Sequence, residues 1–77
     1  MEINIKFFGQ VVDITGNALI KIDDVDDTDT LIKKLHTLYP ALATVKYAVA
    51  VNKKIIQSNT GLQNNFEVAI LPPFSGG

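Results

Sequence analysis

The chain has 77 residues, of which 47% are hydrophobic and 19% are charged, and its formal net charge is -1. This length allows one hydrophobic core, and this composition is typical of a folded domain rather than a disordered chain. The near-neutral charge and the absence of arginine argue against a nucleic-acid partner, which requires a basic surface.

Residues that are missing or rare exclude further classes of site. There is no cysteine, and His36 is the single histidine. No metal site, catalytic thiol or self-contained Ser-His-Asp triad is therefore predicted. Apolar runs such as residues 47–51 are far shorter than the roughly 18 residues of a membrane-spanning helix. The N-terminal segment lacks the features of a signal peptide, which favours a cytoplasmic protein.

Alternating apolar residues predict two strands at the start of the chain. Residues 2–7 and residues 18–22 each alternate between apolar and polar side chains, which is typical of half-buried strands. The glycine-containing segment 9–16 between them predicts a turn, so the two strands are expected to pair as a hairpin. Phe8 falls on the polar face, where a charged residue would be expected.

Five aspartates lie between residues 23 and 29. A calcium loop that begins at Asp24 is not expected, because its sixth position is Asp29 instead of Gly and its twelfth is Leu35 instead of Glu. The acidic segment instead suits the start of a helix, with Thr28 or Asp29 as the N-cap.

The segment from Thr30 to Tyr39 predicts one amphipathic helix that Pro40 ends. Its lysines and His36 are expected to face solvent, and His36 is not assigned a function. The predicted buried stripe consists of Leu31, Ile32, Leu35, Leu38 and Tyr39.

The second half of the chain predicts three more strands: residues 47–51, a short strand at 55–56 after a tight turn, and residues 66–70. Together the elements predict an α+β fold of the β-grasp (ubiquitin-like) type. This fold has a mixed sheet of four or five strands, one main helix across one face, and the first and last strands side by side.

Residues 72–77 are predicted to form an extended tail that follows a domain of residues 1–71. Pro72 and Pro73 cannot donate to a strand ladder and stiffen the chain, and the six tail residues reach about 20 Å. The two final glycines fit a slot that only bare backbone can enter. A partner that holds ATP can activate the Gly77 carboxylate as an acyl-adenylate. A terminus without function is the alternative.

Two misplaced apolar residues lie next to the predicted tail exit. Phe8 and Leu71 are both expected on the outer face of the sheet, on neighbouring strands. With the small side chains of Ala48, Ala50 and Ala69 they are predicted to form an apolar patch that docks a partner.

The segments INIKFFGQV, AVNKKI and EVAILPPFSGG resemble the ubiquitin-like sulfur-carrier family of molybdopterin synthase small subunits, over nearly the whole chain. The resemblance implies that an ATP-dependent activating enzyme, using Mg and ATP, adenylates Gly77. Sulfur from a donor protein then converts it to a thiocarboxylate. The resemblance also implies a cytoplasmic chain that catalyses nothing alone and binds no cofactor itself.

The same resemblance implies a role for the tail and the patch. The large subunit of the synthase would take up the tail (Pro72, Pro73, Phe74, Ser75, Gly76 and Gly77), and the thiocarboxylate would pass sulfur to the cyclic pyranopterin precursor of the molybdenum cofactor. Phe8 and Leu71 match partner-facing positions of the family, although Leu71 replaces a more usual aromatic residue. Val12 replaces a frequent arginine, so no role is carried over to it.

Three other functions fit the sequence. A protein modifier would use the same activated Gly77 to acylate lysines of target proteins. A sulfur carrier for thiazole synthesis shares the terminal Gly-Gly, but is disfavoured by Pro72-Pro73 and by the chain length. A β-grasp binding domain would not need its tail, so deleting Gly76 and Gly77 would leave its function intact.

Overall fold

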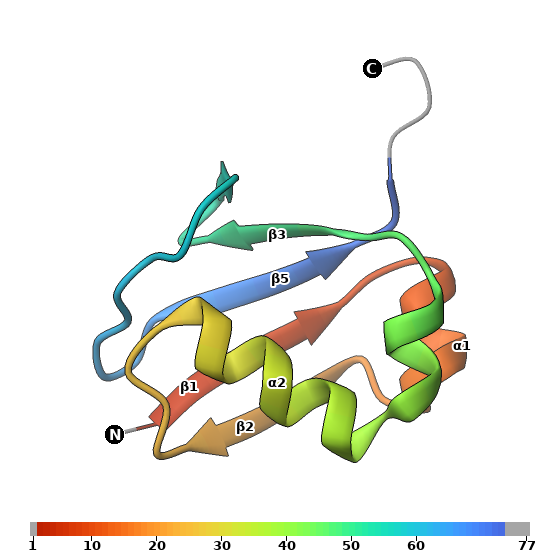
Figure 1. Cartoon of the computed structure of the whole chain (residues 1–77), viewed down its shortest axis with the longest axis horizontal. Coiled ribbons are helices and arrows are strands. Elements are labelled where there is room, and N and C mark those ends of the chain that lie inside the picture. Colours follow the sequence, from red (N-terminus) through yellow and green to blue (C-terminus); the bar gives the residue numbers. More distant parts are fainter. Residues whose placement is uncertain (1, 74–77) are drawn as a thin grey trace.

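Five strands form one mixed sheet in the computed structural model, which describes residues 2–73 (Figure 1). The strand order is β2-β1-β5-β3-β4, with β1 and β5 parallel and the other neighbours antiparallel. The predicted β-grasp fold and the pairing of the first and last strands are confirmed. The strands are β1 (Glu2–Phe7), β2 (Leu19–Asp23), β3 (Ala48–Val51), β4 (Lys54–Ile56) and β5 (Glu67–Leu71).

The period-2 pattern of the strands separates a buried inner face from an outer face. In β1 the residues Ile3, Ile5 and Phe7 are buried, and in β5 Val68 and Ile70 are fully buried. Residues between them in sequence are half-buried and lie on the outer face. Because β1 and β5 are the inner strands of the sheet, their inward-facing residues form the sheet side of the hydrophobic core, as the sequence predicts.

The main helix α2 (Thr28–Leu38) crosses the inner face of the sheet (Figure 1). Leu31 and Leu35, four residues apart, are fully buried against the strands. The helix ends before Pro40 as predicted, but Leu38 at its last position is 51% exposed instead of buried. The chain continues into a 3-10 helix, η1 (Pro40–Thr44), and this helix buries Leu42.

The N-cap of α2 is Asp27, so the predicted caps Thr28 and Asp29 are wrong by one or two residues. Asp27 has extended backbone, and its carboxylate accepts a hydrogen bond of 2.9 Å from the Thr30 N–H. The Thr28 hydroxyl is occupied elsewhere, because it accepts a hydrogen bond from the Thr60 N–H of the loop before β5. A contact between distant segments therefore fixes where the helix starts.

Asp27 gives a testable pH dependence. Hydrogen bonds from Thr30, and a further one from Asn59, hold the pKa of the Asp27 carboxyl below its usual value. A carboxyl group whose pKa is lower in the folded state stabilises the protein at pH values above its unfolded-state pKa of about 3.9. This stabilisation is lost as the pH falls through the folded-state pKa. Asn is as good an N-cap as Asp but does not titrate. The Asp27→Asn variant is therefore expected to lose less thermal stability than the wild type on acidification below about pH 4.

Circular dichroism melts across this pH range check the result. Asp27→Ala serves as the comparison, because it removes the cap itself and should melt at a lower temperature at neutral pH. Identical acid dependence of the wild type and Asp27→Asn would contradict the expectation.

Residues 10–15 form a short helix, α1 (Gln10–Thr15), where the sequence predicts a turn. The helix follows Gly9 and ends at Gly16, both of which have positive φ, so the break predicted at Gly16 is confirmed. Val11 and Thr15, four residues apart, are buried. A six-residue helix is not stable alone, so packing against the body stabilises it and local sequence does not reveal it.

The tight turn predicted between β3 and β4 is confirmed. Asn52 and Lys53 both have positive φ, 48° and 74°, and Val51 pairs with Lys54 across them. Asn52 also clamps the start of β5, because its backbone N–H donates to the Glu67 carbonyl and its side-chain oxygen accepts from the Glu67 N–H.

Candidate functional site

The outer face of the sheet carries the predicted apolar patch. Leu71 of β5 lies beside Ala48 of β3 in the strand register, and Ala69 lies beside Ala50 one step further. Phe8 follows β1, and its ring is 43% exposed. Its N–H donates to the Ile70 carbonyl at 3.1 Å, so the β1–β5 pairing reaches the level of Leu71. The structure therefore places the five predicted residues on one face of the sheet, although Ala50 is only 4% exposed and adds almost no surface to the patch.

Two further exposed apolar residues lie on this face, and the sequence pattern does not predict them. Ile55 of β4 is 52% exposed and pairs with Ala50, and Leu19 of β2 is 53% exposed and pairs with Lys6. Each stands on an edge strand. A strand of three residues, such as β4, is too short for alternation to determine which side chain faces outward. Hereafter the apolar patch is Phe8, Ala48, Ala50, Ile55, Ala69 and Leu71.

The other end of the outer face is polar. Lys6 and Glu67 form an ion pair of 3.1 Å between β1 and β5, and Lys21 and Glu2 form one of 3.7 Å between β2 and β1. All four side chains are well exposed, so these pairs stabilise the fold little. Glu2, Lys21 and Glu67 lie away from the tail exit, whereas Lys6 lies beside Ala69 in the strand register and therefore borders the apolar residues. The chain leaves β5 at the apolar end of this face.

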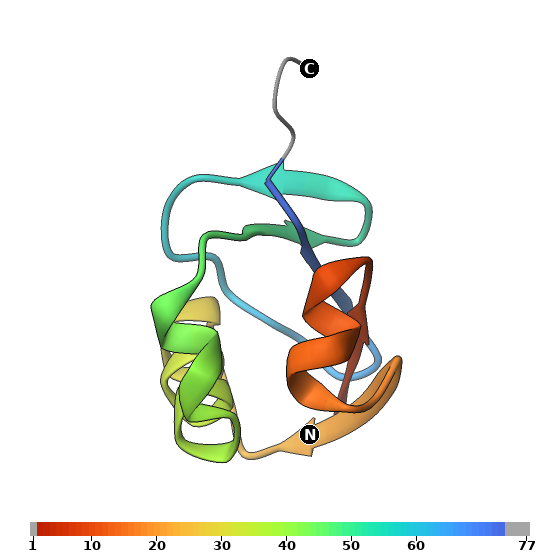
Figure 2. The same ribbon diagram turned by 90° about the vertical axis from the view of Figure 1, so that its right-hand side faces the viewer.

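The tail begins next to the apolar patch. Figures 1 and 2 show β5 leaving the sheet at the end where α1 and η1 lie. Pro72 is half-buried and Pro73 is exposed. The remaining predicted tail residues Phe74, Ser75, Gly76 and Gly77 lie outside the described residues, so their predicted roles stay predictions.

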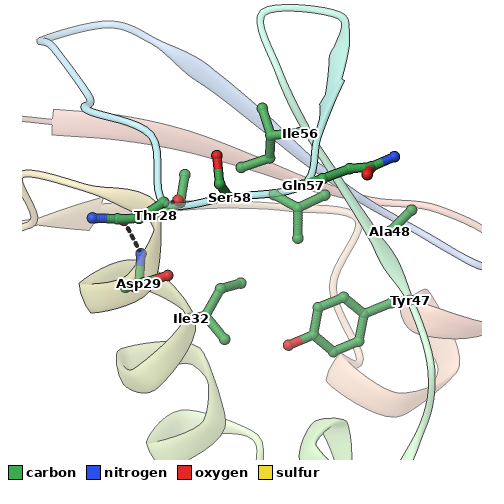
Figure 3. Close-up of a pocket in the computed structure, with 10 residues that line it drawn as sticks. Thr28, Asp29, Ile32, Tyr47, Ala48, Ile56, Gln57 and Ser58 are labelled. Carbon is green, nitrogen blue, oxygen red and sulfur yellow. Dashed lines mark hydrogen bonds between the residues drawn. The ribbon is translucent and has the colours of Figure 1, made fainter.

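A separate hollow of about 260 Å³ lies between α2 and the strands β3 and β4 (Figure 3). Ile32, Val49 and Ile56 give it an apolar lining, and Asp29 and Asn59 lie at its polar end. These polar groups already bond to each other, because the Asn59 side-chain oxygen accepts a hydrogen bond of 2.9 Å from the Asp29 N–H. This bond fixes one side of the hollow, and no function is assigned to the hollow.

His36 lies near this hollow and is less solvated than predicted. Its Nε2 and the Tyr47 hydroxyl are 2.7 Å apart, and the two rings pack edge to face. Burial raises the pKa of the Tyr47 phenol above its ordinary value. The pair joins α2 to the segment before β3 and has a structural role.

Residues 2–73 contain neither a group of metal ligands nor a membrane-spanning helix. No three side chains of the metal-binding types are grouped closely enough there to hold an ion. None of the helices in this part of the chain is both long and apolar enough to cross a membrane.

The sheet topology and the apolar patch beside the chain exit define a small β-grasp protein of the ubiquitin-like class. A model of the ThiS family matches residues 5–77. The chain therefore belongs to the ThiS family.

Known proteins that are similar over nearly the whole chain support this family assignment. The chain is 32% identical over 83 aligned residues to the molybdopterin synthase sulfur carrier subunit of Dictyostelium discoideum, covering 99% of this chain and 96% of the relative. Among solved structures, it is similar to a complex of subunits 1 and 2 of molybdopterin-converting factor from Helicobacter pylori, with a TM-score of 0.75, 26% identity and full coverage of both chains.

A protein named as a modifier has the same fold. Small archaeal modifier protein 1 from Methanosarcina acetivorans has a TM-score of 0.85 at 23% identity, with 99% of this chain and 96% of that chain covered. At this identity the likeness concerns the fold alone.

Proposed function

We propose that this chain is the sulfur-carrier subunit of a molybdopterin synthase. The observation that carries the proposal is the similarity over 99% of the chain to a relative named as such a subunit. The structure supports it with an exposed apolar patch at the root of the tail, where a partner that receives the tail would also have to bind.

In the proposed cycle, the Gly77 carboxylate attacks ATP held by an activating enzyme, which forms an acyl-adenylate and releases pyrophosphate. A persulfide on a donor protein then displaces AMP and forms an acyl disulfide. A thiol reductant cleaves the S–S bond of this adduct and leaves the thiocarboxylate on Gly77. The bare glycines suit this chemistry, because no side chain crowds the carbonyl carbon.

The charged carrier then binds the large synthase subunit through the apolar patch, and its tail enters that subunit's active site. The thiocarboxylate sulfur attacks a carbon of the cyclic pyranopterin precursor, displaces an oxygen substituent and forms a thioester. Water then cleaves the thioester, which leaves the sulfur on the pterin and restores the Gly77 carboxylate. Two rounds supply the two sulfur atoms of the dithiolene. In this proposal the folded domain provides the binding surface and the tail provides the reactive terminus, whereas the partner proteins provide catalysis.

Intact mass spectrometry tests the proposal directly. The full chain is incubated with the activating enzyme, Mg and ATP, and a sulfur donor. The expected result is a mass gain equal to the difference between sulfur and oxygen, which is absent without ATP. Transfer to the precursor in the presence of the large subunit should then return the chain to its original mass.

Two outcomes would contradict the proposal. Conjugates joined to lysines of other proteins, with no thiocarboxylate, would indicate a protein modifier. Sulfur transfer only to a thiazole precursor would indicate the other kind of sulfur carrier.

A further inference from the structure

The two tail prolines differ in their environment, although the sequence treats them alike. Pro72 is half-buried, whereas Pro73 is exposed. The Pro72 ring packs on the backbone of Gly9: a Cβ added to Gly9 would lie 2.9 Å from Pro72 Cγ and 3.5 Å from Cδ. Such an approach requires a residue without a side chain at position 9.

The turn that meets Pro72 is fixed on both sides. Before it, the Phe8 N–H donates to the Ile70 carbonyl at 3.1 Å and ties the turn to β5. After it, the Gly9 carbonyl accepts a hydrogen bond of 3.1 Å from the Val12 N–H of α1. Gly9 itself has φ +56°, a conformation that glycine adopts readily. The short helix α1 therefore holds a seat for the first residue of the tail.

We propose that Pro72 is a positioning residue, seated on Gly9, and that the part of the chain available to a partner's active site begins at Pro73. This inference rests on the proposed function of the tail. Residues 73–77 span about 17 Å at full extension. A root fixed at Pro72 limits the volume that this segment searches and lowers the entropy lost when it enters a partner.

A matched pair of variants tests the proposal. Pro72→Ala and Pro73→Ala make the same chemical change, but only the first removes ring atoms packed on Gly9. Both variants are thiocarboxylated, and the single-turnover rate of sulfur transfer is measured with saturating large subunit. Pro72→Ala should slow transfer about three- to tenfold, because one more residue must be ordered when the tail enters the active site of the docked large subunit. The Kd should change less than the rate, because the apolar patch that docks the partner is intact. Pro73→Ala lies in the segment that enters the partner and also loosens the chain, so it should slow transfer as well. Its effect should be smaller than that of Pro72→Ala, because Pro73 is exposed and only the Pro72 ring packs on Gly9.

An equal slowing by the two variants would overturn the proposal. A measurement on the free wild-type chain separates this inference from the proposed function. Nuclear Overhauser effects are expected between the Pro72 ring protons and the Gly9 α protons. Their absence would overturn the seat even if sulfur transfer is observed. If these effects are present but no sulfur transfer is observed, the contact between Pro72 and Gly9 stands and the proposed function is rejected.

Discussion

Deletion of Gly77 is expected to abolish thiocarboxylate formation. The reacting atom in the proposed cycle is the carbonyl carbon of this residue. A chain that ends at Gly76 brings its carboxylate up to about 3.5 Å short of the adenylation site. A displacement of about 1 Å is sufficient to cost a hundredfold in rate, so no mass gain should be detected when the variant is incubated with the activating enzyme, ATP and a sulfur donor.

A fusion that adds residues after Gly77 gives the complementary variant, because it converts the terminal carboxylate into an amide. It should also gain no sulfur. Ser75→Ala is the matched control, since it keeps both the length and the final glycines. Normal cofactor assembly by the fused chain would refute the proposal that the terminal carbonyl is the reactive group.

Truncation of Phe8 is expected to weaken binding of the large synthase subunit. A ring at the centre of an interface contributes about 2 kcal/mol or more when truncated to alanine, which corresponds to an increase in Kd of about 30-fold. Phe8 is 43% exposed in the free chain, so Phe8→Ala should change the stability of the carrier much less than its affinity. Isothermal titration calorimetry measures the Kd, and thermal melts measure the stability.

Two further variants locate the binding surface. Ile55→Ala lies in the apolar patch and should also weaken binding, because Ile55 is 52% exposed beside Ala50. Leu38→Ala is the control, since Leu38 is equally exposed at 51% but belongs to α2 on the other face. If Leu38→Ala weakens binding as much as Phe8→Ala, the outer face is not the docking surface.

The apolar patch explains why Phe8 and Leu71 break the polar pattern of their strands. An exposed phenylalanine alone is ordinary on a protein surface. Here the register sets Leu71 beside Ala48. Because the alanine side chains are small, the larger apolar side chains protrude above their neighbours. Lys6, which lies beside Ala69 in the register, is paired with Glu67. An apolar partner surface can therefore approach the tail exit without burying an unpaired charge.

The sequence by itself determined the strand pattern, the main helix and the two outward apolar residues. These features follow from side-chain periods of two and 3.6 residues, which are local properties. The pairing of the first and last strands also followed, because the β-grasp arrangement satisfies all the predicted apolar faces with one core.

Only the tertiary structure decided the remaining features of the site. The helix α1, the cap at Asp27 and the outward position of Ile55 depend on contacts with segments distant in sequence. The same holds for the difference between Pro72 and Pro73, which comes from Gly9, more than sixty residues earlier in the chain. Short segments have too few residues to fix their own conformation, so the body against which they pack determines it.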